Sequence, residues 1–292
     1  MQGVVFYLVY PIIYLVACLP FRLLYGLSDF LYFLLKLTGY RREVVVSNLR
    51  NSFPEKTDQE IRTLADSYFR YLCDLTLETL KTLTMTEREA RERCEFHGKE
   101  IIDRLYEKKQ SFIIAMGHLG NWEWAGPSFS LNNKHQLVVI YRPLSNPYFE
   151  KMTVGMRTKW NTQITPVALT LRDMVARRKT TTATVLVADQ SAFGDKGYWT
   201  KFLNQDTCVF TGPEKLSTKF NYPIVFLYIK RKKRGWYDVF VEMLVEEPTK
   251  TVENEISETF IRRLEKEILL DPVTWLWSHK RWKYKREDYP DA

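Results

Sequence analysis

The sequence has little that supports disulfide, zinc or serine-hydrolase chemistry. Its four cysteines are scattered with no CxxC pair: Cys18, Cys73, Cys94 and Cys208. This spacing argues against a structural zinc site and a disulfide framework, and it fits a reducing compartment. The chain also contains no HExxH and no GxSxG sequence, so it lacks the signatures of a zinc protease and of a serine nucleophile elbow.

Composition limits the choice without making it. The 292 residues are 45% hydrophobic, which is enough to bury a large core, and the formal net charge is +8. A basic protein favours acidic partners, and three kinds remain open: nucleic acid, anionic lipid headgroups, or an acidic carrier protein. No internal repeat or low-complexity linker divides the chain.

The N-terminal segment is the most apolar part of the sequence. Residues 3–19 carry no charge, and the apolar character continues to Leu37 with three interruptions, at Arg22, Asp29 and Lys36. A spanning helix needs roughly 20 apolar residues, so residues 3–19 are slightly short, and Pro11 and Pro20 break the pattern. We predict a membrane anchor over residues 1–38, either spanning or interfacial; a buried helical hairpin is the alternative.

Two further signals concern the same segment. Arg41 and Arg42 follow it directly, which predicts a cytoplasmic catalytic domain on the inner membrane. The sequence before Cys18 resembles a lipoprotein cleavage box. However, no positive charge precedes the apolar stretch, which continues beyond Cys18, so we favour an uncleaved anchor.

Beyond residue 38 the pattern predicts one catalytic domain, residues 39–292. Helical spacing fills most of the chain up to Lys109, with possible capping boxes at Thr57 and Thr86. Short apolar runs then predict buried strands at 111–117, 137–141, 184–188 and 223–229. Helical patterns at 146–160, 170–178 and 212–220 alternate with them, which predicts an α/β fold with a mainly parallel sheet flanked by helices. A turn at 230–235, a strand at 236–245 and an amphipathic helix at 252–270 follow.

The chemical centre is predicted directly after the first buried strand. There the sequence reads HLGNWEW, from His118 to Trp124. Functional groups gather outside the carboxyl ends of parallel strands. Glu123 is expected on the first turn of the next helix, where its carboxylate can orient the imidazole. His118 then acts as general base on a substrate hydroxyl.

Other interpretations of this block are weaker. His118 and Glu123 supply only two of the three protein ligands that a catalytic zinc needs, so we predict no metal and no cofactor. The oxyanion of a tetrahedral intermediate needs donors. Backbone N–H groups around Gly120 and Asn121, or a nearby arginine, could supply them. Trp122 and Trp124 fit core packing and acyl-chain contact about equally.

Several blocks together resemble one family. HLGNWEW is similar to the H-x4-D/E signature of glycerolipid acyltransferases, in the form found in the late, lauroyl/myristoyl-type acyltransferases of lipid A biosynthesis. Further blocks follow in that family's order: YRP at Tyr141 with Asn146, an arginine at Arg157, ADQ ending at Gln190, and WSHKRWK from Trp277 to Lys283. The residues after Arg157 and after Gln190 depart from the family pattern, which bears on acceptor and acyl length more than on the reaction.

The resemblance implies an enzyme that moves an acyl group from a thioester to a lipid hydroxyl. The expected donor is acyl carrier protein or acyl-coenzyme A, and the expected acceptor is an anionic lipid A precursor. Seven residues are implied to contact substrate: Gly120, Asn121, Arg142, Arg157, Asp189, Gln190 and Arg281. Of these, Asp189 is expected to be an orienting or structural carboxylate. Another lipid acceptor, or a catalytically inactive lipid-binding relative, stays open.

The C-terminal segment 280–286 (KRWKYKR) mixes cations with aromatic residues. Such a patch can bind nucleic acid by stacking and phosphate contact, or an anionic membrane surface. The apolar N-terminus favours the membrane, so we predict no nucleic-acid partner.

Overall fold

The computed structural model of the protein describes residues 2–192, 194 and 197–289, so the outer ends of the two predicted domains, residues 1 and 292, lie outside it. The chain begins with five helices: α1 (Gln2–Cys18), α2 (Phe21–Thr38), α3 (Arg42–Ser52), α4 (Asp58–Lys81) and α5 (Glu87–Arg93). The predicted capping boxes start α4 and α5. In each, the threonine hydroxyl accepts a hydrogen bond from the backbone N–H of the glutamate three residues later, and the glutamate carboxylate accepts one from the threonine N–H.

A seven-stranded sheet forms the centre of the molecule, in the order β1-β9-β8-β2-β5-β3-β4. Neighbouring strands are parallel except for the antiparallel pair β8–β9. The predicted mainly parallel α/β fold is therefore confirmed. The strands are β1 (Cys94–His97), β2 (Phe112–Met116), β3 (Gln136–Tyr141), β4 (Gln163–Pro166), β5 (Thr182–Val187), β8 (Ile224–Lys233) and β9 (Trp236–Val245).

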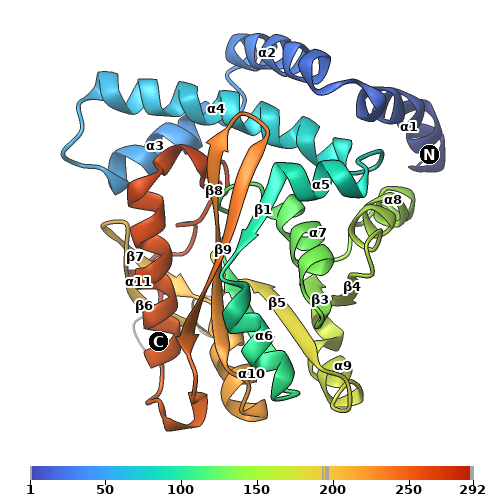
Figure 1. Ribbon diagram of the computed structural model, residues 1–292. Coiled ribbons are helices and arrows are strands. Elements are labelled where there is room, and N and C mark those ends of the chain that lie inside the picture. Colours follow the sequence, from blue (N-terminus) through green and yellow to red (C-terminus); the bar gives the residue numbers. More distant parts are fainter. Residues whose placement is uncertain (1, 193, 195–196, 290–292) are drawn as a thin grey trace.

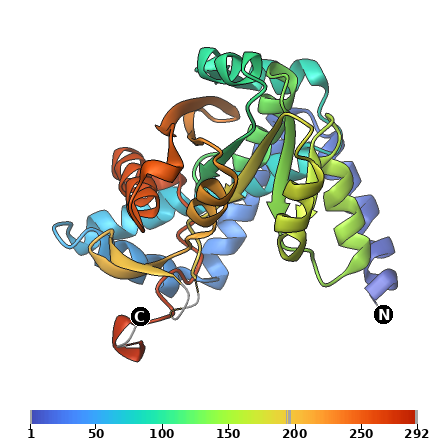
Figure 2. The same ribbon diagram turned by 90° about the horizontal axis from the view of Figure 1, so that it is seen from below.

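Helices cover both faces of this sheet, with α11 on one side and α7 on the other (Figures 1 and 2). Strand β2 is buried at all five positions, which matches its continuous apolar run. The remaining helices are α6 (Lys99–Glu107), α7 (Trp122–Asn132), α8 (Pro147–Arg157), α9 (Thr170–Ala176), α10 (Gly212–Phe220) and α11 (Glu255–Leu270), with short 3₁₀ turns η1 (Val167–Leu169), η2 (Pro248–Lys250), η3 (Pro272–Thr274) and η4 (Arg286–Asp288).

Several elements differ from the prediction, including strand β4, which was not predicted. Strand β1 lies in the region predicted to be helical, because four residues between two helices are too few to show a period. The predicted turn 230–235 is shorter, since β8 pairs with β9 as far as Lys233 and leaves Arg234 and Gly235 to turn. A hairpin of β6 (Tyr198–Phe202) and β7 (Gln205–Val209), separate from the main sheet, was not predicted.

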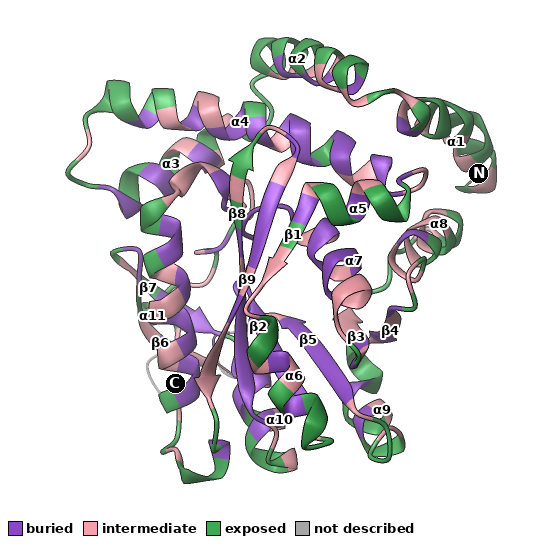
Figure 3. Ribbon diagram, in the orientation of Figure 1, coloured by how far each residue is buried: buried purple, intermediate pink, exposed green. Residues whose placement is uncertain are grey.

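The predicted anchor segment forms two helices that lie along the outside of the molecule. Most of their apolar side chains are exposed, so a buried hairpin is not what forms (Figure 3). Phe6 of α1 stacks on Tyr148 of α8, with ring centroids 5.6 Å apart, while α2 packs against α4. No helix in the described part of the chain combines the length and the apolar character needed to cross a membrane. Membrane anchoring therefore stays a prediction.

Candidate active site

The residues between β2 and α7 form a loop whose conformation requires glycine at position 120. Gly120 has a φ of +63°, and a Cβ built there would lie 2.6 Å from Cβ of Ile229. Its N–H donates to the carbonyl of Thr274 at 3.1 Å, and Leu119 bridges Trp275. Only glycine fits this conformation without strain. The C-terminal segment thus fixes residues 117–121, which carry His118.

His118 is held by Asp189, which follows the neighbouring strand β5. The imidazole Nδ1 lies 2.7 Å from Asp189 Oδ1, and the backbone N–H of His118 donates to Oδ2 at 2.7 Å. The indole N–H of Trp275 donates to the same Oδ2 at 2.8 Å. A carboxylate at Nδ1 requires the proton on that nitrogen, which leaves Nε2 as an acceptor. The arrangement is that of a general base with its orienting carboxylate.

The protonation equilibria of this pair support that arrangement. Burial is the largest influence on the pKa of His118 and lowers it, but the charge and hydrogen bond of Asp189, with a smaller contribution from Glu123, outweigh burial and raise the pKa above 6.5. Burial acts to raise the pKa of Asp189, yet the charge and hydrogen bonds of His118 lower it to about 2. Asp189 is therefore a carboxylate throughout the range in which the imidazole titrates.

Glu123, predicted to orient His118, instead binds Arg157, and this corrects the prediction. Arg157 Nη2 lies 2.6 Å from Glu123 Oε1, and Arg157 Nε lies 3.1 Å from Oε2. The bidentate pair joins the first turn of α7 to the last residue of α8. Glu123 does begin a helix as predicted, but that turn faces α8, while Asp189 already occupies the Nδ1 side of the imidazole. Only the charge of Glu123 acts on His118.

His118 and the Glu123–Arg157 pair line one cleft of about 490 Å³, while Asp189 is buried next to His118. His118, Glu123 and Arg157 supply its polar wall, and the Trp122 indole contacts His118 edge to face at 5.0 Å. The rest of the lining is largely apolar, including Ile114, Met116, Phe129, Leu137, Val139 and Val185. A base beside an apolar cavity of this size suits a substrate with a reactive end and a hydrocarbon chain.

The other predicted contact residues separate into two groups. Arg142 and Gln190 are exposed and line the cleft, and the Arg142 guanidinium forms no hydrogen bond or ion pair with the described residues. Gly120, Asn121 and Arg281 do not line it. The Arg281 guanidinium is 3% exposed and donates to the carbonyl of Cys208 at 2.9 Å, and burial lowers its pKa to about 10.

Sequence reasoning took Arg281 from the C-terminal segment as a substrate contact but missed other residues of this segment. His279 and Lys283 also line the cleft. His279 Nε2 lies 3.4 Å from the N–H of Ser191, and burial lowers the pKa of this histidine to about 4. Trp275 donates to Asp189, as described above. The block from Trp277 to Lys283 was the available signal. It is far from the HLGNWEW motif in the sequence, so only the fold shows that the two segments are close in space.

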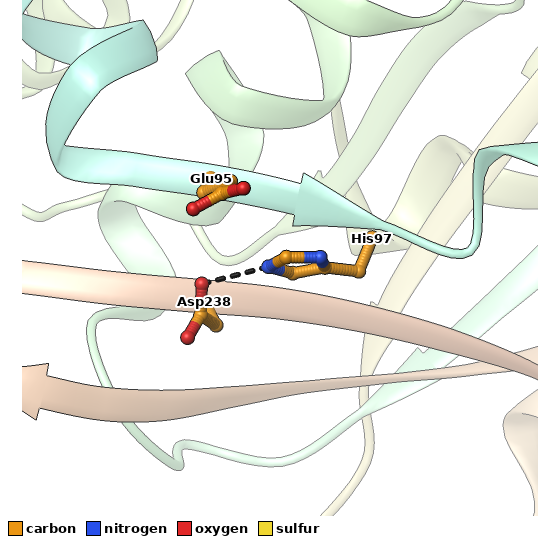
Figure 4. Close-up of side chains that lie close together, drawn as sticks. All are labelled: Glu95, His97 and Asp238. Carbon is orange, nitrogen blue, oxygen red and sulfur yellow. Dashed lines mark hydrogen bonds and ion pairs between the residues drawn. The ribbon is translucent and has the colours of Figure 1, made fainter.

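Outside this cleft, three side chains in the described part of the chain lie close enough together to hold a metal ion: Glu95, His97 and Asp238 (Figure 4). His97 Nε2 lies 2.7 Å from Asp238 Oδ1. However, the ammonium of Lys232 lies 2.7 Å from Glu95 and 2.9 Å from Asp238, so these carboxylates already have a cation. The cluster lies on β1, β8 and β9 and lines no part of the cleft. We interpret it as an ion-pair network.

Fold and site together place a histidine, oriented by a buried carboxylate, beside an apolar cleft in an α/β domain. The family model for bacterial lipid A biosynthesis acyltransferases matches residues 1–284, and the chain belongs to this family. It is 23% identical over 281 residues to a lipid A biosynthesis acyltransferase of Haemophilus influenzae, covering 94% of this chain and 88% of that protein. It is 22% identical over 284 residues to a lipid A biosynthesis lauroyltransferase of Escherichia coli, covering 96% and 91%. The predicted family and the enzyme class, acyltransferase, are confirmed.

Proposed function

We propose that the protein transfers a fatty acyl group from the thioester of acyl carrier protein to a hydroxyl of a lipid A precursor at a membrane surface. Acyl transfer in lipid A biosynthesis follows from the family; the donor, the hydroxyl acceptor and the membrane are the proposal. The observation that carries it is His118, which lines an apolar cleft and whose imidazole is hydrogen-bonded to the buried Asp189.

The geometry assigns each step a group. Nε2 of His118 removes the proton from the acceptor hydroxyl, and the hydroxyl oxygen attacks the thioester carbonyl carbon. Asp189 stabilises the imidazolium that forms. The tetrahedral intermediate then collapses, the carbon–sulfur bond breaks, and the imidazolium returns the proton to the departing thiolate. An ester and a free thiol result, with no metal or redox cofactor in the scheme.

Arg157 is the best-placed donor for developing negative charge. Two of its N–H groups bind Glu123, and arginine carries five, so the remainder can reach an oxyanion or a phosphate. Glu123 thus acts on substrate through Arg157 by holding the guanidinium flat against the cleft. Arg142 and Gln190 at the exposed lining are the candidates for contacts to headgroup phosphates or to the carrier.

Charge favours the carrier protein as the donor. The chain has a net charge of +8, and both Arg142 and Lys283 line the cleft. An acidic carrier would be attracted to this surface, and its docking would weaken with salt. Coenzyme A presents fewer charges over a smaller area, so transfer from it should depend less on ionic strength.

The apolar side chains of α1 and α2 support the membrane part of the proposal. Leu8, Ile12 and Leu15 of α1 are each more than 60% exposed, as is Leu37 of α2. Interfacial helices bind a bilayer through such a face. Replacing Leu8, Ile12 and Leu15 together with Ser should release protein from the membrane fraction, whereas the equally exposed surface change Val252→Ser should not. Unchanged membrane binding of the triple variant would place the anchor elsewhere.

The experiment for the reaction uses the detergent-extracted protein. It is incubated with lauroyl-carrier protein or lauroyl-coenzyme A, and with lipid A precursors or a mixture of phospho-, glyco- and aminolipids. Mass spectrometry should show one added acyl group on the lipid A precursor, formed faster from the carrier protein. A product only on another lipid would replace the acceptor. No product with any pair would favour an inactive lipid-binding relative.

A further inference from the structure

A carboxylate with no role in the proposed reaction lies at the centre of the helical layer. Glu78 of α4 is 0% exposed, and its carboxylate has no ion pair with the described residues. Instead it accepts three hydrogen bonds from neutral groups. The Tyr25 hydroxyl donates to Oε1 at 2.9 Å, and the Asn121 amide and the Tyr237 hydroxyl donate to Oε2 at 2.8 and 2.7 Å.

Such a group is costly to bury. Moving a carboxylate out of water costs several kcal/mol even after relaxation, and an apolar residue of similar size at the same place avoids that cost. Burial is the main cause that raises the pKa of Glu78 above its ordinary value. A carboxyl group at this position therefore weakens the core of the helical layer, which points to a role for its hydrogen bonds other than stability.

The partner that points to this role is Asn121, in the loop that carries His118. Its side-chain amide forms two hydrogen bonds with different roles. Oδ1 accepts the N–H of Trp124 at 3.1 Å and so caps α7, while Nδ2 donates to Glu78. Glu78 also accepts the Trp124 indole N–H through its backbone carbonyl, at 3.0 Å. These contacts fix where α7 begins, at Trp122, four residues after His118 and one before Glu123.

The second partner joins this support to the N-terminal helices. Tyr25 belongs to α2, whereas Tyr237 belongs to β9, so Glu78 ties helix, sheet and loop together at one carboxylate. The path from α2 to the base is Tyr25, Glu78, Asn121 and then the loop. Each step is a side-chain hydrogen bond of 2.9 Å or less.

We propose that Glu78 is a positioning residue for acyl transfer, which holds the His118 loop and the start of α7 in their reactive geometry through Asn121, and that Tyr25 makes helix α2 part of this support. The proposal rests on the proposed function, since it concerns the same site. It gives the N-terminal helices a second role beside membrane binding: they stabilise the active site from behind.

Three variants test the link between Glu78 and Asn121. Glu78→Leu removes the acceptor, and we expect kcat to fall about 10- to 100-fold with the donor KM within about twofold, because a small displacement of catalytic groups has that effect. Asn121→Ala should cause a similar loss. The double variant should be scarcely worse than either single variant, because residues that act through one contact do not add.

Glu78→Gln is the conservative rescue. Its amide oxygen can accept from both Asn121 and Tyr237, and its amide N–H can donate to the Tyr25 oxygen. We therefore expect kcat within about threefold of the wild type. This result would show that hydrogen-bond geometry, and not a charge near the base, is what Glu78 supplies.

The contribution of α2 needs a matched control within the same helix. Tyr25→Phe removes one hydroxyl from Glu78, whereas Tyr32→Phe removes the hydroxyl of another α2 tyrosine that is 7% exposed and forms no hydrogen bond with the described residues. In detergent micelles, Tyr25→Phe should lower kcat about 3- to 10-fold, the value of one ordinary hydrogen bond. Tyr32→Phe should leave it unchanged.

The outcomes separate this proposal from the proposed function. A wild-type protein that forms no acylated lipid contradicts the function. An active wild type whose Glu78→Leu and Asn121→Ala losses multiply, or whose Glu78→Leu retains full kcat, contradicts the positioning role. If Glu78→Leu does not fold, the comparison of Tyr25→Phe with Tyr32→Phe decides. Equal kcat values in these two variants would overturn the part played by α2. A wild-type kcat in Glu78→Gln would not change that conclusion.

Discussion

Two hydrogen-bonded pairs, His118–Asp189 and Glu123–Arg157, contribute to the same cleft but differ in the depth of their carboxylates and in the partners that these hold. Asp189 is 2% exposed and holds a histidine that titrates, whereas the side chain of Glu123 is 15% exposed and holds an arginine that does not. The first pair can move a proton. The second pair holds a guanidinium that stays protonated, so it can position and neutralise charge but cannot transfer a proton.

The pairs also show what sequence distance does and does not reveal. Glu123 is five residues from His118 yet binds Arg157, 34 residues away. His118 binds Asp189, 71 residues away, because β2 and β5 are hydrogen-bonded neighbours whose carboxyl ends meet. Strand order therefore decides the partner of the base, and spacing within a motif does not.

Removing the proposed base, His118, should have the largest effect on turnover. His118→Ala is expected to lower turnover by roughly two to four orders of magnitude, the usual value of general acid–base catalysis. The fold should persist, since the side chain lies at a cleft wall. Turnover is measured by mass spectrometry of the lipid product, and circular dichroism checks folding. Near-normal turnover would remove His118 from the reaction and leave the His118–Asp189 pair without a catalytic role.

Changing each carboxylate to its amide separates the pairs. Asp189→Asn should lower kcat by roughly two to three orders of magnitude, because the amide can favour the wrong imidazole tautomer and cannot stabilise the imidazolium. Glu123→Gln should cost less, about 10- to 100-fold, since Arg157 loses its anchor but the base stays oriented. The comparison is a ratio of kcat values at saturating donor. A larger loss for Glu123→Gln than for Asp189→Asn would reverse the two roles.

The pH profile sharpens the same comparison. The reactive form is neutral His118, so activity should rise as pH increases through a pKa that stands above 6.5 in the wild type. Asp189→Asn removes the larger of the raising influences, and burial should then take the acid limb of kcat/KM below 6.5. Glu123→Gln should move it in the same direction by less. An acid limb that responds only to Glu123→Gln would contradict the assignment.

The smallest effect is expected from a change that keeps the charge of the second pair. Arg157→Lys retains the cation but loses the bidentate contact to Glu123. We expect kcat to fall about 3- to 10-fold, because the lysine keeps the charge and only about one ordinary hydrogen bond is lost, with the acid limb of the pH profile almost unmoved. A loss as large as that of His118→Ala would make Arg157 indispensable to the chemistry.

Much of the fold could be predicted because the patterns are local. Helix α10 and strand β9 have the predicted bounds, and the strand ends that carry His118 and Asp189 were located by their apolar runs. The two short strands of the β6–β7 hairpin show neither a continuous apolar run nor a clean alternation of apolar and polar residues. The partners of His118, Glu123 and Asn121 depend on which elements become neighbours, and no periodicity encodes that. Arg281, predicted at the substrate, is buried behind the hairpin that the sequence did not reveal.

The central claim is that Asp189, and not Glu123, works through His118. It is tested most directly by single-turnover rates in the His118→Ala background. Asp189→Asn should change the residual rate by less than about twofold there, because an orienting group has nothing left to orient, while Glu123→Gln should reduce it by the same factor as in the wild type. A Glu123→Gln change that becomes silent in this background, with a full additional loss from Asp189→Asn, would contradict the account.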